Sequence, residues 1–339
     1  MVSGQALRND SNQHSVSFFM RQTTISVVAP VYCEGDHLPE FVASLTAELD
    51  QLKTSAGLNY EVVLVDDGSS DNTWEVMRTL TAQYSCLHCL RLSRNFGKDA
   101  ALSAGLAATR GDAVITMDSD MQHPASLIPE MVALWRTGNV DVVDVCKQER
   151  QVESLLSKVC AMSFYRLFEM LTSYDLRGSG DFKLLDRKVV EAWKNLGERK
   201  LFYRGLTSWM GFRHEQIMFT PCLRCGGSSK WSLARRVTLA VDSMTSFSGK
   251  PLLLIGIITL LFYALSFFVG CEALWSYATG HARSGFTTVI LLILLTGSAI
   301  LTGLCIMSAY IHHAFIELKG RPRYLLAETL EAKNTDPDQ

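Results

Sequence analysis

The chain has 339 residues, of which 48% are hydrophobic, and its net charge at pH 7 is −2. This length permits one large domain or two ordinary ones, and the hydrophobic share is high for a protein without membrane-embedded segments. The near-zero net charge does not indicate a nucleic-acid partner, and we expect none.

Residues 1–22 are polar and mixed, without an apolar run long enough for a signal peptide, so we expect a flexible cytoplasmic segment. Nine cysteines, an odd number in a reducing compartment, predict free thiols. The C-x-x-C pairs, Cys86/Cys89 and Cys222/Cys225, leave zinc open as an alternative. The first pair lies in a strand-like run, where side chains three positions apart face opposite sides of a sheet and cannot share a metal.

Residues 23–225 alternate between strand-like and helix-length segments, which predicts an α/β domain. The strand-like runs are nearly continuous in valine and isoleucine, as expected for a mostly parallel sheet covered by helices on both faces. The predicted strands are TTISVVAPVY (23–32), YEVVLVDDGS (60–69), CLHCLRLS (86–93), DAVITMDSD (112–120) and VDVVDVCK (140–147).

Polar segments follow four of these strands: PVYCEGD, VDDGSSD, SRNFGKD and MDSDMQHP. In parallel sheets ligands bind at the carboxyl ends of the strands, so these segments predict one common site. Within VDDGSSD, Asp66 or Asp67 could bind a nucleobase or a ribose hydroxyl. An ordinary strand-to-helix turn capped by Ser70 or Asp71 is the alternative.

The segment MDSDMQHP carries Asp118, Asp120 and Gln122 at alternate positions. Alternate side chains of an extended chain face the same side, so these three could hold a metal ion and a substrate between them. Mg²⁺ usually binds through one or two carboxylates together with substrate phosphates. We therefore predict a Mg²⁺ or Mn²⁺ site here.

Two long apolar segments late in the chain predict transmembrane helices at 250–272 and 284–311. A pair of buried core helices is the alternative. Lysine and arginine are concentrated before the first segment and after the second, which predicts that the α/β domain and both termini face the cytoplasm. Residues 226–249 then form an amphipathic juxtamembrane segment, and residues 312–339 a cytoplasmic tail.

The motifs PVYCEGD, VDDGSSDNT, LSRNFGKDAALSAG, MDSDMQHP and GSGDFKLLDR occur in this order and precede two apolar segments. In this arrangement the chain resembles the polyprenyl-phosphate glycosyltransferases of glycosyltransferase family 2, and most closely the bactoprenol glucosyltransferases. Dolichyl-phosphate mannose synthases share the general plan. The resemblance covers roughly residues 23–325.

The resemblance implies a Rossmann-like GT-A catalytic domain at the cell inner membrane. It would transfer one sugar, glucose from UDP-glucose, to undecaprenyl phosphate with inversion. By the same resemblance, Pro30, Tyr32, Glu34, Asp66 and Asp67 line the uridine pocket, Lys98 and Asp118 contact the donor, Asp118, Asp120 and Gln122 bind the metal, and Asp120 and Asp181 are catalytic. It also implies a homo-oligomer, a tetramer being one such form.

The acceptor of this reaction is a phosphate, which is already anionic near neutral pH because its second pKa is about 6. A strong base is therefore dispensable, and Asp181 could act as a base or, as we favour, position the acceptor. Basic residues between the last predicted strand and the first membrane segment are candidates for holding the lipid phosphate. They are Lys147, Arg150, Arg204, Arg224 and Lys230. Of these we favour Arg224 and Lys230.

Several alternatives stay open at this point. The sugar could be galactose, an N-acetylhexosamine or mannose. A processive polysaccharide synthase would need more membrane spans and usually a Q-x-x-R-W motif. A nucleotidyltransferase would not need the apolar segments. A non-catalytic membrane scaffold that binds a nucleotide sugar would lack transfer activity.

Overall fold

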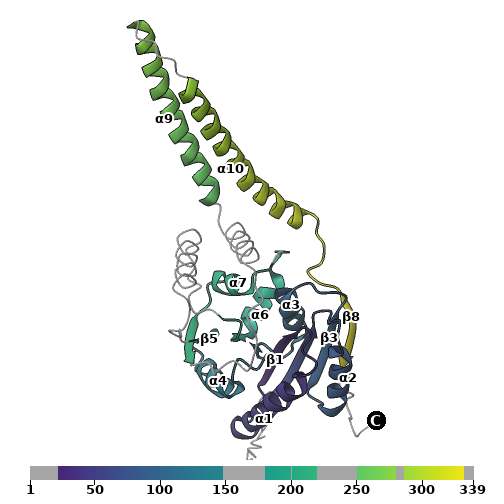
Figure 1. The fold of residues 1–339 in the computed structure, drawn as a ribbon. Coiled ribbons are helices and arrows are strands. Elements are labelled where there is room, and N and C mark those ends of the chain that lie inside the picture. The colour runs from purple at the N-terminus through teal and green to yellow at the C-terminus, as the bar shows by residue number, and fades with distance from the viewer. Residues whose placement is uncertain (1–21, 148–179, 200, 220–249, 280–285, 332–339) are drawn as a thin grey trace, which may run out of the picture.

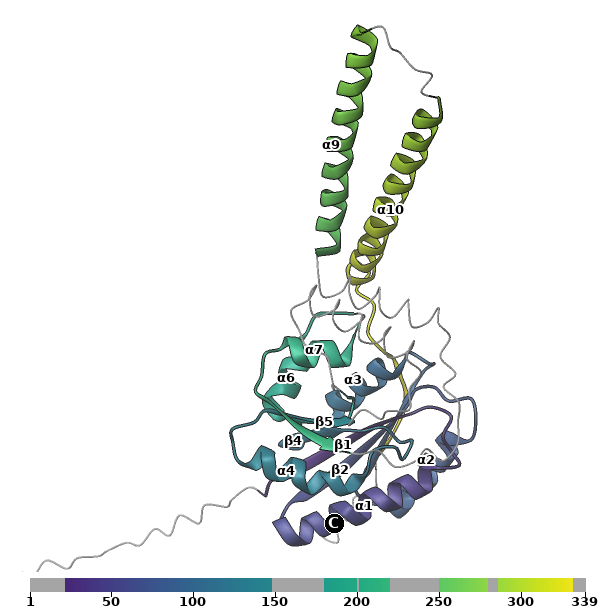
Figure 2. The ribbon, with the colours of Figure 1, turned by 60° about the vertical axis from the view of Figure 1, so that its left-hand side comes forward.

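The computed structural model describes residues 22–147, 180–199, 201–219, 250–279 and 286–331. An α/β domain carries two long helices that project from one of its sides (Figures 1 and 2). The predicted juxtamembrane segment and all but the last residue of the predicted N-terminal segment lie outside the described residues.

Strands from the described residues form one mixed sheet in the order β7-β5-β6-β4-β1-β2-β3-β8. The central strands β4, β1, β2 and β3 are mutually parallel, and β6 and β8 run antiparallel to their neighbours. The strands are β1 (Thr24–Val31), β2 (Asn59–Asp66), β3 (Leu87–Leu92), β4 (Ala113–Thr116), β5 (Val142–Lys147), β6 (Lys183–Asp186), β7 (His214–Phe219) and β8 (Leu326–Glu331). All five predicted strands are present, and the predicted α/β class is confirmed.

Helices cover both faces of the sheet (Figure 2). One face is covered by α1 (Leu38–Ala56), α2 (Thr73–Gln83), the 3-10 turn η1 (Ala125–Leu127) and α4 (Ile128–Arg136). The other is covered by α3 (Lys98–Ala108), α6 (Arg187–Asn195) and α7 (Tyr203–Trp209). Along β2, Val62 and Leu64 pack on the first helix layer, and Val63 and Val65 on the second. Successive strand residues face opposite sides, which explains the nearly continuous apolar runs.

Three strands were not predicted, and each depends on partners far away in the sequence. Strand β6 has only four residues, and β7, HEQIMF, is largely exposed. A buried charged group ties them to β5: the Lys183 ammonium donates to Asp144, whose carboxylate also lies 2.7 Å from His214 Nδ1. Such a pairing keeps a fully buried lysine from being an uncompensated charge.

Strand β8 lies within residues 312–339, where the sequence predicts a tail. It pairs antiparallel with β3 at the sheet edge, and Glu328 accepts hydrogen bonds from Trp74 Nε1 at 3.1 Å and from Arg91 at 3.4 Å. Its residues, LAETLE, are mostly exposed and show no clear alternation of buried positions. Pairing with β3, rather than hydrophobic patterning, therefore makes this segment a strand.

The long helices are α9 (Lys250–Ala278) and α10 (Phe286–Leu318). They extend beyond the predicted limits of 272 and 311. Both are long and apolar enough to cross a membrane, over Ile255–Glu272 and Leu292–Leu318, and neither stretch is buried in the structure. The alternative of two buried core helices is therefore wrong.

Helix α3 packs unusually close to the sheet at Gly105. A Cβ atom at this position would overlap Val28 Cγ1 and would lie 3.1 Å from Val65 Cγ2. Because α3 begins with Lys98, this close packing sets how near the start of α3 stands to the strand ends.

Replacing Gly105 by valine should destabilise the domain by about 1–3 kcal/mol, the usual cost of overpacking a dense core. The new side chain would overlap two β-strand valines and push α3 outward. Thermal unfolding of the purified full chain measures the effect. Ala107→Val, at an exposed position of the same helix, is the control and should leave Tm nearly unchanged. A Tm equal to that of the parent protein would contradict this packing.

Candidate active site

The four polar segments that follow the predicted strands meet at one edge of the sheet. They line an open cavity of about 500 Å³. The residues around it are Pro30, Val31, Tyr32 and Glu34 after β1, Asp67 after β2, Asn95, Gly97 and Lys98 after β3, and Asp118, Ser119 and Asp120 after β4. Most of the predicted donor-binding residues thus lie together.

The two aspartates of the VDDGS turn have different environments. Asp67 lines the cavity, and its carboxylate accepts backbone hydrogen bonds from Phe96 at 2.8 Å and Gly97 at 3.0 Å. Asp66 is fully buried, accepts from the Ser69 amide at 2.8 Å and lies 3.4 Å from Arg91 Nε. Asp66 therefore supports the turn from beneath, whereas Asp67, itself only 4% exposed, borders the cavity.

Gly68 allows this turn to pack against the loop that follows β3. Its φ of 68° is in the left-handed region, and a Cβ there would lie 2.7 Å from Arg94 Cα. Only glycine satisfies both the conformation and the close approach. The ends of β2 and β3 are thereby held together under the cavity.

The segment after β1 is joined to the segment after β4. The Ser119 hydroxyl contacts the Glu34 carboxylate and lies 2.9 Å from the Pro30 carbonyl oxygen. Burial raises the pKa of Glu34, and the neighbouring Asp120 and Asp118 raise it further. Tyr32 lines the cavity and is 48% exposed.

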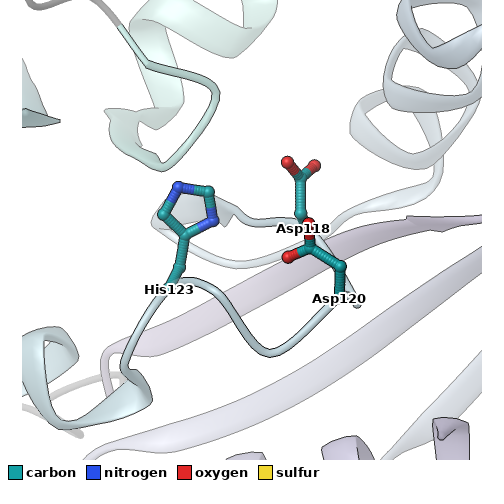
Figure 3. A group of neighbouring side chains, drawn as sticks. All are labelled: Asp118, Asp120 and His123. Carbon is teal, nitrogen blue, oxygen red and sulfur yellow. The ribbon is translucent and has the colours of Figure 1, made fainter. Parts of the chain in front are cut away.

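A candidate metal group lies on the loop after β4 (Figure 3). One ligand atom from each of Asp118, Asp120 and His123 lies within 4.8 Å of the others. Two carboxylates and an imidazole suit Mn²⁺ and permit Mg²⁺. The backbone at Met121 is left-handed, with φ of 60°, and the chain turns there between the two aspartates and His123, whose side chains come together.

This group differs from the predicted set, which contained Gln122 and not His123. The backbone N–H of Gln122 donates to Asp120 Oδ1 at 3.1 Å. The Gln122 side chain remains a predicted ligand. The His123 ring packs 5.3 Å from the Phe182 ring. Alternation along an extended chain selects Gln122, but the observed turn at Met121 interrupts that alternation.

Asp181 lies between two cations, one of which, Lys98, lines the cavity. Lys98 Nζ is 2.5 Å from both Asp181 Oδ2 and Asp118 Oδ1, and Arg204 holds Asp181 through two hydrogen bonds of 2.6 and 2.9 Å. Burial raises the pKa of Asp181, but Arg204 and Lys98 outweigh it and hold this pKa below its usual range. Asp181 is therefore a permanent carboxylate that orients two cations.

Asp99 is a neighbouring acid that was not predicted. Burial, together with the charge of Asp181, raises its pKa to about 6. It follows Lys98 in the first turn of α3, and the motif SRNFGKD contains it. The motif places Asp99 directly after Lys98, which marks it as a candidate site residue. The surroundings that raise its pKa arise only in the folded structure.

The predicted acceptor residues are placed only in part. Arg204 is connected to the site by its hydrogen bonds to Asp181, and Lys147 is the last residue of β5. Arg150, Arg224 and Lys230 lie outside the described residues. Of the C-x-x-C pairs, Cys86 and Cys89 are free cysteines, and Cys222 and Cys225 are outside the described residues.

Paired carboxylates and a lysine thus lie together at the strand ends of a mostly parallel sheet, and the comparisons with known proteins make the chain a glycosyltransferase. Residues 26–193 match the family described as Glycosyl transferase family 2. The chain is 34% identical over 304 residues to a bactoprenol glucosyl transferase of Shigella phage SfX, covering 89% of this chain and 98% of that protein. It is 36% identical over 309 residues to an uncharacterized glycosyltransferase of Synechocystis sp., covering 90% and 95%. The chain belongs to glycosyltransferase family 2, and the predicted family is confirmed.

Solved structures also align with the chain, at lower similarity. Glucosyl-3-phosphoglycerate synthase from Mycobacterium tuberculosis, in complex with Mn²⁺ and uridine diphosphate, aligns with a TM-score of 0.46 and 18% identity, over 67% of this chain and 80% of that one. The ligands of that complex are those of that enzyme.

Replacing His123 by alanine should weaken Mn²⁺ binding about tenfold or more, because it removes one member of the three-residue group. Gln122→Ala should have the smaller effect. Titration of the full chain with Mn²⁺, followed by electron paramagnetic resonance of the free ion, measures both without any turnover. The exposed His37→Ala is the control. A larger loss for Gln122→Ala would restore the predicted ligand set.

Proposed function

We propose that the protein transfers one sugar from a nucleotide donor to a membrane polyprenyl phosphate, with UDP-glucose as donor and undecaprenyl phosphate as acceptor. The similarity to a bactoprenol glucosyl transferase carries this proposal. It extends over 89% of the chain, so it cannot be limited to the α/β domain.

The donor would lie in the cavity at the strand ends. Asp67 and Tyr32 are placed to contact the nucleoside, as acidic residues at strand ends do in nucleotide-binding sheets. Asp118, Asp120 and His123 would hold Mg²⁺ or Mn²⁺, with Gln122 kept as a predicted fourth ligand. When bound, the metal supplies a Lewis acid that neutralises charge on the departing diphosphate. Lys98 adds a permanent positive charge beside the same region.

The chemical step is one displacement at the anomeric carbon. An oxygen of the acceptor phosphate forms the new bond while the bond to the nucleoside diphosphate breaks on the opposite face, which inverts the configuration. Positive charge grows on the sugar, as in glycoside hydrolysis, and the anionic acceptor needs no strong base. Asp181 positions Lys98 and Arg204, and the Arg204 side chain, 43% exposed, can contact the acceptor phosphate.

The helix pair would bring this site to the membrane. Helix α9 leaves the domain and α10 returns to it, so the flanking Lys250, Lys319 and Arg321 lie on the domain side (Figure 2). Lysine and arginine concentrate on cytoplasmic flanks, which favours a cytoplasmic domain at the inner membrane. A homo-oligomer, for example a tetramer, is part of this proposal, as are phosphate contacts by Lys147, Arg150, Arg224 and Lys230.

Transfer of labelled sugar into the lipid phase tests the function directly. Purified protein with undecaprenyl phosphate and Mn²⁺ or Mg²⁺ should label lipid from UDP-glucose, and Asp120→Ala should abolish labelling. UDP-galactose, UDP-N-acetylglucosamine and GDP-mannose form the comparison panel. Labelling from another donor would replace glucose by that sugar. No labelling from any donor by folded protein would favour a nucleotide-sugar-binding scaffold.

Asp181→Asn should reduce kcat about tenfold, because the amide oxygen still accepts one bond from Arg204. Loss of a true general base typically costs about 100-fold to 10,000-fold. Asp181→Ala should cost more than Asp181→Asn, since Lys98 and Arg204 would then lose the carboxylate between them. Steady-state transfer rates across pH distinguish the roles. A drop of about 1,000-fold in Asp181→Asn, with loss of the acidic limb of the profile, would show base catalysis.

A further inference from the structure

A second cavity lies where α10 ends beside the α/β domain. Its volume is about 570 Å³. The lining comes from the last turns of α10, the chain leading to β8, the loop after β3, and Arg199. No residue lines both this cavity and the candidate active site. In the loop after β3, Ser93, Arg94 and Phe96 line this cavity, whereas Asn95 and Gly97 line the candidate active site.

The lining of this second cavity is strongly basic. It contains Arg94, Arg199, Lys319, Arg321 and Arg323, and no aspartate or glutamate. Two of these side chains are engaged within the described residues. Arg323 donates to the carbonyl oxygens of Glu198 and Leu196, and Arg94 donates to the Asn95 carbonyl oxygen at 3.0 Å and lies 4.0 Å from the Phe96 ring centroid. Burial and the nearby Arg199 lower the pKa of Arg323. The cations therefore gather around one space with little internal neutralisation.

The nearest acids do not remove this excess. Glu317 faces Arg199 but accepts its backbone N–H at 2.7 Å. Burial raises the pKa of Glu198, and Glu317 raises it further. Neither acid forms a salt bridge with a cavity cation among the described residues. Three basic side chains, those of Arg199, Lys319 and Arg321, can thus face an anion, with Arg94 adding its charge beside them.

On the side of α10, the apolar Phe315 and Ile316 line the cavity together with His312 and Lys319. Phe315 is 52% exposed and Leu325 is 53% exposed, and Leu318, at the end of the candidate membrane stretch, is 85% exposed. Lys319 follows immediately, with its ammonium 4.2 Å from the Phe315 ring centroid. If α10 spans the bilayer, this junction of apolar and basic side chains lies at headgroup depth.

We propose that this cavity binds the phosphate headgroup of an anionic membrane phospholipid. The basic residues would hold the phosphate, and the lipid chains would lie along the apolar end of α10. Arginine forks match phosphate oxygens in pairs, and juxtamembrane basic clusters attract anionic lipids. A free phosphate or nucleotide would leave the apolar rim in water. The sugar acceptor would have to reach the other cavity, on the opposite side of the loop after β3.

Native mass spectrometry of the full chain in mild detergent tests the proposal. After incubation with phosphatidylglycerol or phosphatidylcholine of equal chain length, the parent protein should retain phosphatidylglycerol preferentially. The double variant Lys319→Gln/Arg321→Gln should bind it at least about tenfold more weakly, since each cation near the headgroups contributes separately. The variant Lys53→Gln/Arg136→Gln removes two exposed cations far from α10 and should bind like the parent.

Three results would overturn the assignment. Equal retention of both lipids would show no headgroup recognition, and undiminished retention by the Lys319/Arg321 variant would place binding elsewhere. Displacement of phosphatidylglycerol by equimolar undecaprenyl phosphate would make this cavity an acceptor site, and displacement by inorganic phosphate would make it a site for soluble anions. Failure of sugar transfer has no bearing on this binding measurement, so the two proposals can fail separately.

Discussion

The ion pairs around Asp181 connect the parts of the molecule on which the site depends. Lys98 starts α3, Arg204 belongs to α7, Asp181 precedes β6, and Asp118 follows β4. Isolated surface pairs contribute little to stability, but a nearly buried carboxylate that lost its partners would be an uncompensated charge. The arrangement therefore fixes two cations beside the candidate metal group without requiring Asp181 to exchange a proton.

The mixed sheet explains how these groups come together. Its central parallel strands place their carboxyl ends at one edge, where each contributes a short polar segment. The antiparallel strand β6 then brings Asp181 back toward the end of β4, where the Thr116 hydroxyl donates to the Asp181 carbonyl oxygen at 2.7 Å. The site thus combines the segments after four parallel strands with Asp181, which precedes the antiparallel strand β6.

Strand β8 links the helix pair to the catalytic sheet. Because it follows α10 and pairs with β3, the end of the apolar helix is held near the loop that separates the two cavities. The Ser93 amide donates to the Leu325 carbonyl oxygen at 2.8 Å, directly before that loop. This connection gives a physical basis for the proposal that a membrane-derived acceptor meets a donor bound in the domain.

By itself the sequence determined the α/β class, the five main strands, the two apolar helices and the polar segments of the site, because these follow from local hydrophobic patterns and motif order. It assigned Asp66 and Asp67 the same role and did not point to His123, because the lining of the cavity and the left-handed turn at Met121 cannot be read from the order of adjacent residues. It also missed Asp99 and β8, whose environment and pairing depend on distant segments. Those distinctions were decided only by tertiary structure, since contacts between residues far apart in the chain set burial, charge pairing and strand pairing.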